Sequence, residues 1–212
     1  MVYHVLNRGN GGMRLFHKAG DYEAFERVLA EGLARYAVEL FTYCLMPNHW
    51  HLVVRPQTDE ALGRWMGWVG VTHVRRHHER YHSRGGGHLY QGRFKSLPVA
   101  EDEHFLALCR YVEANPRRAR LVERAEQWRW SGLARRRRHA DDLPLSAWPM
   151  ERPSDWLARV NRDLKQAQLD AIRVCVARGR PLGHADWVQQ TAERLGLGFT
   201  LRRPGRPSKL PK

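Results

Sequence analysis

The alternation of apolar and polar positions predicts a strand, a helix and a second strand in the first 46 residues. Residues 3–8 are apolar and β-favouring and end in a glycine-rich stretch, which indicates a strand followed by a loop. Residues 21–37 carry apolar side chains at helical spacing, which predicts an amphipathic helix with one buried face. Residues 38–46 form a near-continuous apolar run of β-formers, and such a run is typical of a central strand.

The following segment predicts an antiparallel partner strand and a long helix. Pro47 and Asn48 favour a turn, so residues 49–54 are expected to return beside the preceding strand. Residues 58–81 place apolar side chains on one helical face, after a Thr or Asp that caps the helix. Two paired strands and a second helix are therefore expected here.

A further strand and a third helix complete the main domain. Residues 88–99 predict a strand or hairpin, and a helix begins near residue 102. We expect that helix to end near Asn115, because Pro116 disfavours helical geometry in the residue before it. The order of elements is typical of a ferredoxin-like α+β fold, an antiparallel sheet with the helices on one face.

The chain changes character beyond about residue 122. Residues 135–138 are four consecutive arginines, and prolines punctuate the segment that follows. Short helices are expected after it, and the last dozen residues are basic and rich in proline. We therefore expect a main domain over residues 1–125, a basic, proline-containing linker over 126–153, a small helical extension over 154–200 and a basic, disordered tail over 201–212.

The composition adds a strong positive charge. There are 36 Lys and Arg against 22 Asp and Glu, a formal net charge of +14. A large positive charge spread over a chain is typical of proteins that bind polyanions, so nucleic acid is the leading candidate partner. The alternative is a basic, soluble protein that uses arginine freely, so the charge alone does not decide.

Cysteine usage and hydropathy indicate the compartment. The three cysteines are widely separated and lie in apolar stretches, which indicates neither a disulfide framework nor a CxxC zinc site. No apolar run approaches the length of about 18 residues that a membrane helix needs. We expect a cytoplasmic protein with no membrane partner.

His49 and His51 are a candidate metal-binding pair. Side chains two apart in a strand lie on the same face about 6.5 to 7 Å apart, so both imidazoles could bind one cation while Trp50 points into the core. With 12 histidines in the chain, chance explains one such pair. The pair alone is therefore a weak signal.

Tyr111 and Asn115 strengthen that signal. They are four residues apart on the third helix, so a phenol and an amide lie one turn apart on the same face. A nucleophile and a third metal ligand would then share one face. In the competing interpretation, Tyr111 is a packed core residue and Asn115 is only the C-terminal residue of the helix before a proline.

Four segments together resemble the HUH-type single-tyrosine transposases, and among them the REP-associated tyrosine transposases most. They are YHVLNRG at 3–9, LMPNHWHLVV at 45–54, QGRFKS at 91–96 and RYVEANP at 110–116. They occur in the order of that family within residues 1–125. The resemblance implies that His49, His51 and Asn115 bind a divalent ion and that Tyr111 is the catalytic nucleophile.

The resemblance also implies an activity. The enzyme would nick and rejoin single-stranded, hairpin-bearing DNA through a 5′-phosphotyrosine intermediate, as a transposase. Because the ligands are two imidazoles and an amide, we expect activity with Mg²⁺ or Mn²⁺ and tighter binding of Mn²⁺. The partner would be single-stranded or hairpin DNA from REP-like repeats, which implies a nucleoid-associated location in a bacterium.

Five further residues are expected to contact DNA. They lie near the first loop and near the fourth strand, where cationic and amide side chains meet phosphates and unpaired bases. For each cation, the alternative is a solvated surface charge. These residues are Asn7, Arg8, Arg14, Arg93 and Lys95.

Two other functions compete with this hypothesis. The first is a non-catalytic, domesticated hairpin-DNA-binding protein, whose binding would depend neither on Tyr111 nor on metal. The second is a zinc-dependent hydrolase that uses the same histidines and forms no covalent adduct. We expect a monomer, and the alternative is a dimer in which Tyr111 serves the metal site of the partner.

Overall fold

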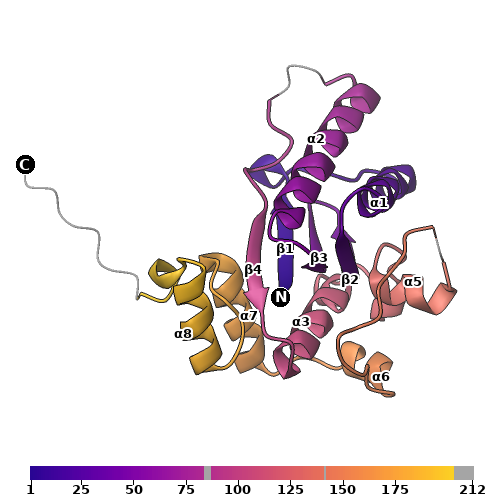
Figure 1. Cartoon of the computed structure of the whole chain (residues 1–212). Coiled ribbons are helices and arrows are strands. Elements are labelled where there is room, and N and C mark those ends of the chain that lie inside the picture. Colours follow the sequence, from indigo (N-terminus) through magenta and orange to yellow (C-terminus); the bar gives the residue numbers. More distant parts are fainter. Residues whose placement is uncertain (84–86, 141, 203–212) are drawn as a thin grey trace, which may run out of the picture.

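The computed structural model describes residues 1–83, 87–140 and 142–202, and the fold is built on one antiparallel sheet (Figure 1). The strand order is β2-β3-β1-β4, and every neighbouring pair is antiparallel. The α+β class and the antiparallel sheet predicted from the sequence are confirmed. The strands are β1 (Val2–Arg8), β2 (Val38–Met46), β3 (His49–Pro56) and β4 (Lys95–Val99).

Helices cover both faces of the sheet, whereas the sequence was interpreted as placing them on one face. Helices α1 (Ala19–Leu33) and α2 (Ala61–Tyr81) share one core with Trp50 and Leu52 of β3. Helix α3 (Glu103–Glu113) shares a second core with Val53 of the same strand. The apolar run of β2 explains the difference, because successive strand residues point to opposite faces and each apolar face needs cover.

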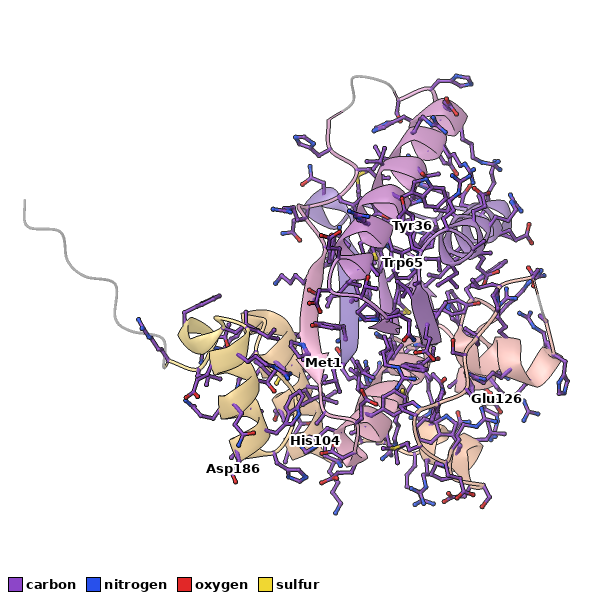
Figure 2. All side chains as sticks on the ribbon, viewed as in Figure 1. Met1, Tyr36, Trp65, His104, Glu126 and Asp186 are labelled. Carbon is purple, nitrogen blue, oxygen red and sulfur yellow. The ribbon has the colours of Figure 1, made fainter. Side chains whose placement is uncertain are left out.

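Trp65 illustrates how the first core is filled. It is labelled on α2 in Figure 2, and its side chain is fully buried in the core shared with the sheet. A hypothetical Cβ on Gly32 of α1 would lie 2.5 Å from the Trp65 indole nitrogen. Only glycine therefore lets α1 and α2 approach this closely at that point.

Strand β2 lies at an edge of the sheet, not at its centre as predicted, and the segment over 126–153 covers that edge. The backbone N–H of Leu45 donates to the Trp130 carbonyl at 2.9 Å, and the N–H of Ser146 donates to Leu40 at 2.8 Å. Helix α5 (Gly132–Arg138), which follows η2 (Ala125–Gln127), lies in the same segment. The prediction of a linker there was wrong, because these residues satisfy backbone groups of an edge strand.

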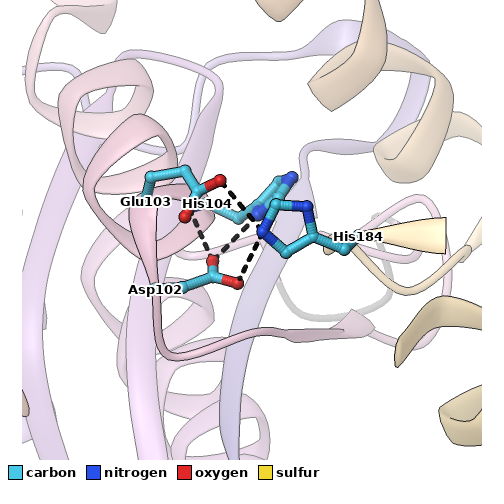
Figure 3. Close-up of side chains that lie close together, drawn as sticks. All are labelled: Asp102, Glu103, His104 and His184. Carbon is cyan, nitrogen blue, oxygen red and sulfur yellow. Dashed lines mark hydrogen bonds and ion pairs between the residues drawn. The ribbon is translucent and has the colours of Figure 1, made fainter. Parts of the chain in front are cut away.

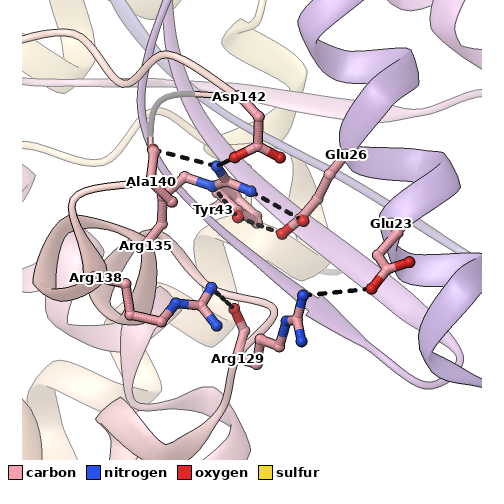
Figure 4. A network of polar contacts seen from close by, with 8 residues as sticks. All are labelled: Glu23, Glu26, Tyr43, Arg129, Arg135, Arg138, Ala140 and Asp142. Carbon is pink, nitrogen blue, oxygen red and sulfur yellow. Dashed lines mark hydrogen bonds and ion pairs between the residues drawn. The ribbon is translucent and has the colours of Figure 1, made fainter.

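Arg135 anchors this cover in a buried polar network (Figure 4). Its side chain is 3% exposed, and its guanidinium lies 3.0 Å from a carboxylate oxygen of Glu26 in α1. It also donates to the Tyr43 hydroxyl at 2.9 Å and to Asp142. Burial would disfavour either charge alone, so the network ties α5, α1 and β2 together.

We expect Arg135→Met to lower the free energy of unfolding by about 3 to 5 kcal/mol, because it leaves the buried Glu26 carboxylate without its partner. Arg137→Met, in the exposed part of the same arginine run, is the matched control and should change stability by less than about 0.5 kcal/mol. Urea unfolding monitored by circular dichroism measures both. Equal effects of the two substitutions would contradict a structural role for the network.

The C-terminal helices attach to the outer edge of β4. The backbone N–H of Leu182 donates to the Pro98 carbonyl at 2.9 Å, and the N–H of Ala100 donates to the Leu182 carbonyl at 2.8 Å. The expected helices are present, whereas residues 203–212 of the predicted tail lie outside the described residues. The bounds are α6 (Trp156–Asn161), α7 (Gln166–Arg178), α8 (Ala185–Arg194) and η3 (Gly198–Thr200).

Within the described part of the chain, no helix is both long enough and apolar enough to cross a membrane.

Candidate active site

A cleft of about 620 Å³ opens where β1 ends and β3 and β4 begin, next to the C-terminal half of α3. It gathers all the residues predicted for the site from the sequence except Arg14, which is exposed and does not line it. The cleft also contains four residues for which the sequence predicts no role in the site, namely Leu6, Asn48, Gln91 and Gly92. Its full lining is Leu6, Asn7, Arg8, Asn48, His49, His51, Gln91, Gly92, Arg93, Lys95, Tyr111 and Asn115.

The two histidines of β3 point toward α3 and have their Nδ1 atoms occupied. His49 Nδ1 lies 2.7 Å from the Asn48 side-chain oxygen, so this nitrogen donates its proton. His51 Nδ1 lies 2.9 Å from Nε2 of His4. The ring centroids of His49 and His51 are 5.0 Å apart. The Nε2 of His49 therefore keeps its lone pair, and that of His51 does so when His51 is the donor to His4.

His4 was not assigned a role from the sequence. It is fully buried, lies on the same face of β1 as Leu6, and stacks on the His51 ring at a centroid distance of 5.1 Å. The alternation of side chains along β1 was the available signal. His4 and Leu6 lie on the same face of the strand, and Leu6 pairs with His51. That pairing is a long-range feature, so the sequence alone did not reveal it.

Burial keeps the two histidines of the cleft and the adjacent His4 neutral. It lowers the pKa of His49 to about 4 and that of His4 to about 3, and it holds the pKa of His51 well below its ordinary value. The charge of Arg118 lowers the pKa of His49 and His51 further. Neutral imidazoles have no proton to lose before they bind a cation, so the pair is suited to metal at neutral pH.

We expect the free energy of unfolding to fall as the pH is lowered from about 7.5 to about 5.5. Burial lowers the pKa of both His4 and His73 from 6.5 to about 3, so in this window the unfolded chain binds more protons than the folded chain. Each such group then costs about 1.4 kcal/mol per pH unit below its unfolded pKa. Urea midpoints at the two pH values measure the effect, and an equal or higher midpoint at the lower pH would contradict it.

Tyr111 reaches the cleft from α3, and its ring stands edge-on to the rings of His51 and His4. Its ring centroid lies 6.0 Å from that of His51, with an angle of 83° between the ring planes. Helix α3 ends at Glu113, and Asn115 begins the short helix α4 (Asn115–Arg118) that contains Pro116. Asn115 is buried, and its Nδ2 has no hydrogen-bond partner among the described residues. Tyr111 and Asn115 therefore both line the cleft, but they come from two consecutive helices and not from one helix as predicted.

Arg118 contacts both the ring and the backbone of Tyr111 and was not predicted as a site residue. Its guanidinium carbon lies 4.1 Å from the centre of the Tyr111 ring, and its Nη1 donates to the Tyr111 carbonyl at 2.9 Å. Burial lowers the pKa of Arg118 somewhat, but a guanidinium remains charged at neutral pH. The available signal was its spacing of seven residues from Tyr111, about two helical turns.

The rim of the cleft is cationic. Arg8, Arg93 and Lys95 are exposed, and each of them lines the cleft. Asn7 is partly tied down, since its Nδ2 donates to the Gly92 carbonyl at 3.1 Å and its Oδ1 accepts from the Arg8 backbone at 2.8 Å. Charges of one sign along a cleft attract a polyanionic strand toward the groups at its base.

Comparison with known proteins identifies the family. The family described as "Transposase IS200 like" matches residues 1–115, more than half of the chain. The chain therefore belongs to the IS200-like transposases, which establishes a transposase role. No match is found among curated proteins.

Two solved structures are similar to this chain at low sequence identity. A REP-associated tyrosine transposase bound to a REP hairpin has 16% identity and a TM-score of 0.50, and the match covers 77% of this chain and 87% of that one. A protein of Deinococcus radiodurans assigned as a transposase has 15% identity and a TM-score of 0.42, with 53% of this chain and 88% of that one covered. The first of these supports the fold alone.

Proposed function

We propose that this transposase is a metal-dependent transesterase that nicks and rejoins single-stranded, hairpin-bearing DNA through Tyr111. One observation carries the proposal: a single cleft holds a phenol, two neutral imidazoles and an exposed cationic rim. A phenol beside a metal-binding pair fits nucleophilic attack on a phosphodiester. Because Tyr111 and His51 of one chain lie together, we also propose that Tyr111 acts in its own chain, as a monomer allows.

The residues of the chain fit a divalent cation such as Mn²⁺ or Mg²⁺. The proposed ligands are Nε2 of His49, Nε2 of His51 and the side-chain oxygen of Asn115. The Nδ2 atom of Asn115 is buried and has no hydrogen-bond partner among the described residues. Imidazole nitrogen suits Mn²⁺ better than Mg²⁺. When bound, the ion would offset negative charge on the reacting phosphate.

Tyr111 would perform the covalent step. Its phenolic oxygen forms a bond to phosphorus as the bond to the 3′ oxygen breaks; the phenol loses its proton and the departing oxygen gains one. One phosphoester replaces another of similar energy, so a 3′ hydroxyl can reverse the step without ATP. Cutting and rejoining are then the same reaction in opposite directions, with Tyr111 linked to a 5′ phosphate in between.

The cationic rim would hold the DNA. Arg8, Arg93 and Lys95 surround the cleft mouth, where they meet the phosphates on either side of the scissile bond. The structurally similar protein is bound to a REP hairpin, which supports a hairpin from REP-like repeats as the substrate here. Arg14 lies outside the cleft, so any contact it makes would be with DNA beyond the reacting strand.

Arg118 would keep the phenol in the attacking orientation. We expect Arg118→Ala to slow adduct formation about 10-fold at saturating DNA, because a desolvated cation–π contact contributes on the order of 1 to 2 kcal/mol. Arg118→Lys should restore part of the rate. The matched control is Arg117→Ala, which removes only the ion pair with Asp163. Unchanged adduct rates in Arg118→Ala would contradict this positioning role.

A denaturing gel tests the proposal. The purified chain is incubated with Mn²⁺ or Mg²⁺ and labelled single-stranded hairpin oligonucleotides taken from repeats flanking its gene. A slow-migrating covalent band that chelator abolishes supports the transesterase. Cleavage without any adduct would instead indicate a hydrolase, and hairpin binding with neither cleavage nor adduct would indicate a non-catalytic binding protein.

A further inference from the structure

A group of side chains of the types that bind metal ions lies at the end of β4 remote from the cleft. The cleft is lined by Lys95, the first residue of β4, whereas Asp102, Glu103 and His104 follow the last residue of that strand, at the start of α3. His184 reaches them from the residue before α8 (Figure 3). One ligand atom from each of the four lies within 4.8 Å of the others.

We propose that Asp102, Glu103, His104 and His184 form a structural binding site for a zinc-class divalent cation. The site would fasten the C-terminal helices to the domain that carries the cleft. Its four protein ligands would fill a tetrahedral coordination sphere and leave no open position for substrate, which is typical of structural rather than catalytic zinc. This inference does not rest on the function proposed for Tyr111.

The spacing of the donor atoms fits one small ion. His184 Nε2 lies 3.0 Å from Glu103 Oε1 and 3.5 Å from Asp102 Oδ2, and His104 Nδ1 lies 2.8 Å from Asp102 Oδ1. Tetrahedral ligands at zinc bond lengths of about 2.0 to 2.1 Å are separated by roughly 3.3 to 3.4 Å. These three separations bracket that value, and one ligand atom from each residue lies within 4.8 Å of the others, so side-chain rotations that shorten the longer separations would bring all four donors onto one ion.

The backbone brings these donors together independently of their side chains. Leu182 pairs with β4 through hydrogen bonds to Pro98 and Ala100, which sets the path of the chain two residues before His184. A Cβ on Gly183 would lie 2.4 Å from the Trp187 ring and 3.1 Å from the Ala100 side chain. The close approach at Gly183 therefore fixes His184 beside α3, as a preformed ligand set requires.

The charge balance of the cluster favours a cation. Asp102 and His184 are the N-cap residues of α3 and α8, so each helix contributes a partial charge of about +0.5 near the cluster. Two carboxylates outweigh that sum and leave a net negative charge for a divalent ion to offset. The competing interpretation is a set of surface ion pairs between the carboxylates and protonated histidines, and such pairs require no metal.

Metal binding by the full chain distinguishes these interpretations. His49→Ala serves as the background, because it removes a ligand of the proposed catalytic site. After treatment with chelator, this protein should bind one Co²⁺ with the strong visible absorption of tetrahedral cobalt, and excess Zn²⁺ should displace it. Adding His184→Ala should weaken binding by more than about 100-fold and remove that absorption, because a direct ligand is lost. Glu103→Gln in the same background should weaken binding in the same direction.

Controls keep this outcome separate from the function of the cleft. His184 is 63% exposed, so its replacement by Ala should leave the fold intact, which circular dichroism checks. His88→Ala, at another exposed histidine, should leave the cobalt absorption unchanged. His184→Ala alone should form the Tyr111 adduct at the wild-type rate. Absence of tetrahedral absorption in His49→Ala, or its persistence after His184→Ala is added, would overturn the proposal and leave surface ion pairs as the explanation.

Discussion

Replacing Tyr111 by Phe should abolish the covalent protein–DNA adduct and slow strand cleavage by more than about 10⁴-fold, the scale seen when a catalytic nucleophile is removed. The substitution deletes one oxygen and keeps the ring that packs near His51 and under Arg118. Hairpin binding and thermal stability should therefore stay close to those of the wild type. Single-turnover cleavage on denaturing gels measures the rate.

Tyr36→Phe is the matched control for this substitution. Tyr36 packs against Trp68 of α2, on the opposite side of the sheet from Tyr111, and its replacement should leave cleavage unchanged. An adduct that persists in Tyr111→Phe would show that another residue is the nucleophile. Cleavage that persists without an adduct would point to water as the nucleophile.

Replacing either His49 or His51 by Ala should remove metal-dependent cleavage, with a loss of at least about 100-fold in metal affinity or rate. Each imidazole is engaged through Nδ1, which leaves its Nε2 as the proposed metal ligand that the substitution removes. Hairpin binding at low salt should be retained, because the cationic rim is intact. Mn²⁺ titration and cleavage assays over a range of metal concentrations measure the two effects.

The two histidines should not be equivalent in stability. His51 is 4% exposed and hydrogen-bonded to His4, whereas His49 is half-buried. Deleting the His51 ring leaves a cavity beside β1, so His51→Ala should also lower the thermal midpoint, and His49→Ala should do so less. His88→Ala should change neither metal binding nor cleavage. Full metal-dependent activity in His49→Ala would exclude that residue as a ligand.

Local sequence patterns were sufficient for the main strands and helices of residues 1–113 and for most of the candidate site. The predicted strand over 38–46 has the observed bounds, because an apolar run of β-formers bounded by a proline turn leaves few alternatives. The spacing of His49 and His51 placed that pair on one face of β3, whereas Tyr111 lies in α3 and Asn115 in the next helix, α4. The cleft then brings these four residues together, as the linked motifs implied.

The features that were missed depend on contacts between distant segments. Strand β2 reads as central because it is apolar on both faces, yet it lies at the edge, where residues near Trp130 and Ser146 satisfy its backbone. The arginine run predicts a solvated linker, but Arg135 is buried and forms an ion pair with Glu26, more than a hundred residues earlier in the chain. His4 became part of the site only through the register of β1 against β3.

The most direct test of the central claim is to identify the covalent bond itself. Wild-type protein is incubated with Mn²⁺ and hairpin DNA labelled at either its 5′ or its 3′ end, then denatured, digested and analysed by mass spectrometry. We predict that the adduct carries the 3′-end label, that the 5′-labelled fragment is released with a free 3′ hydroxyl, and that the modified peptide bears a phosphodiester on Tyr111. An adduct on another residue, or one that retains the 5′-end label, would contradict the proposed mechanism.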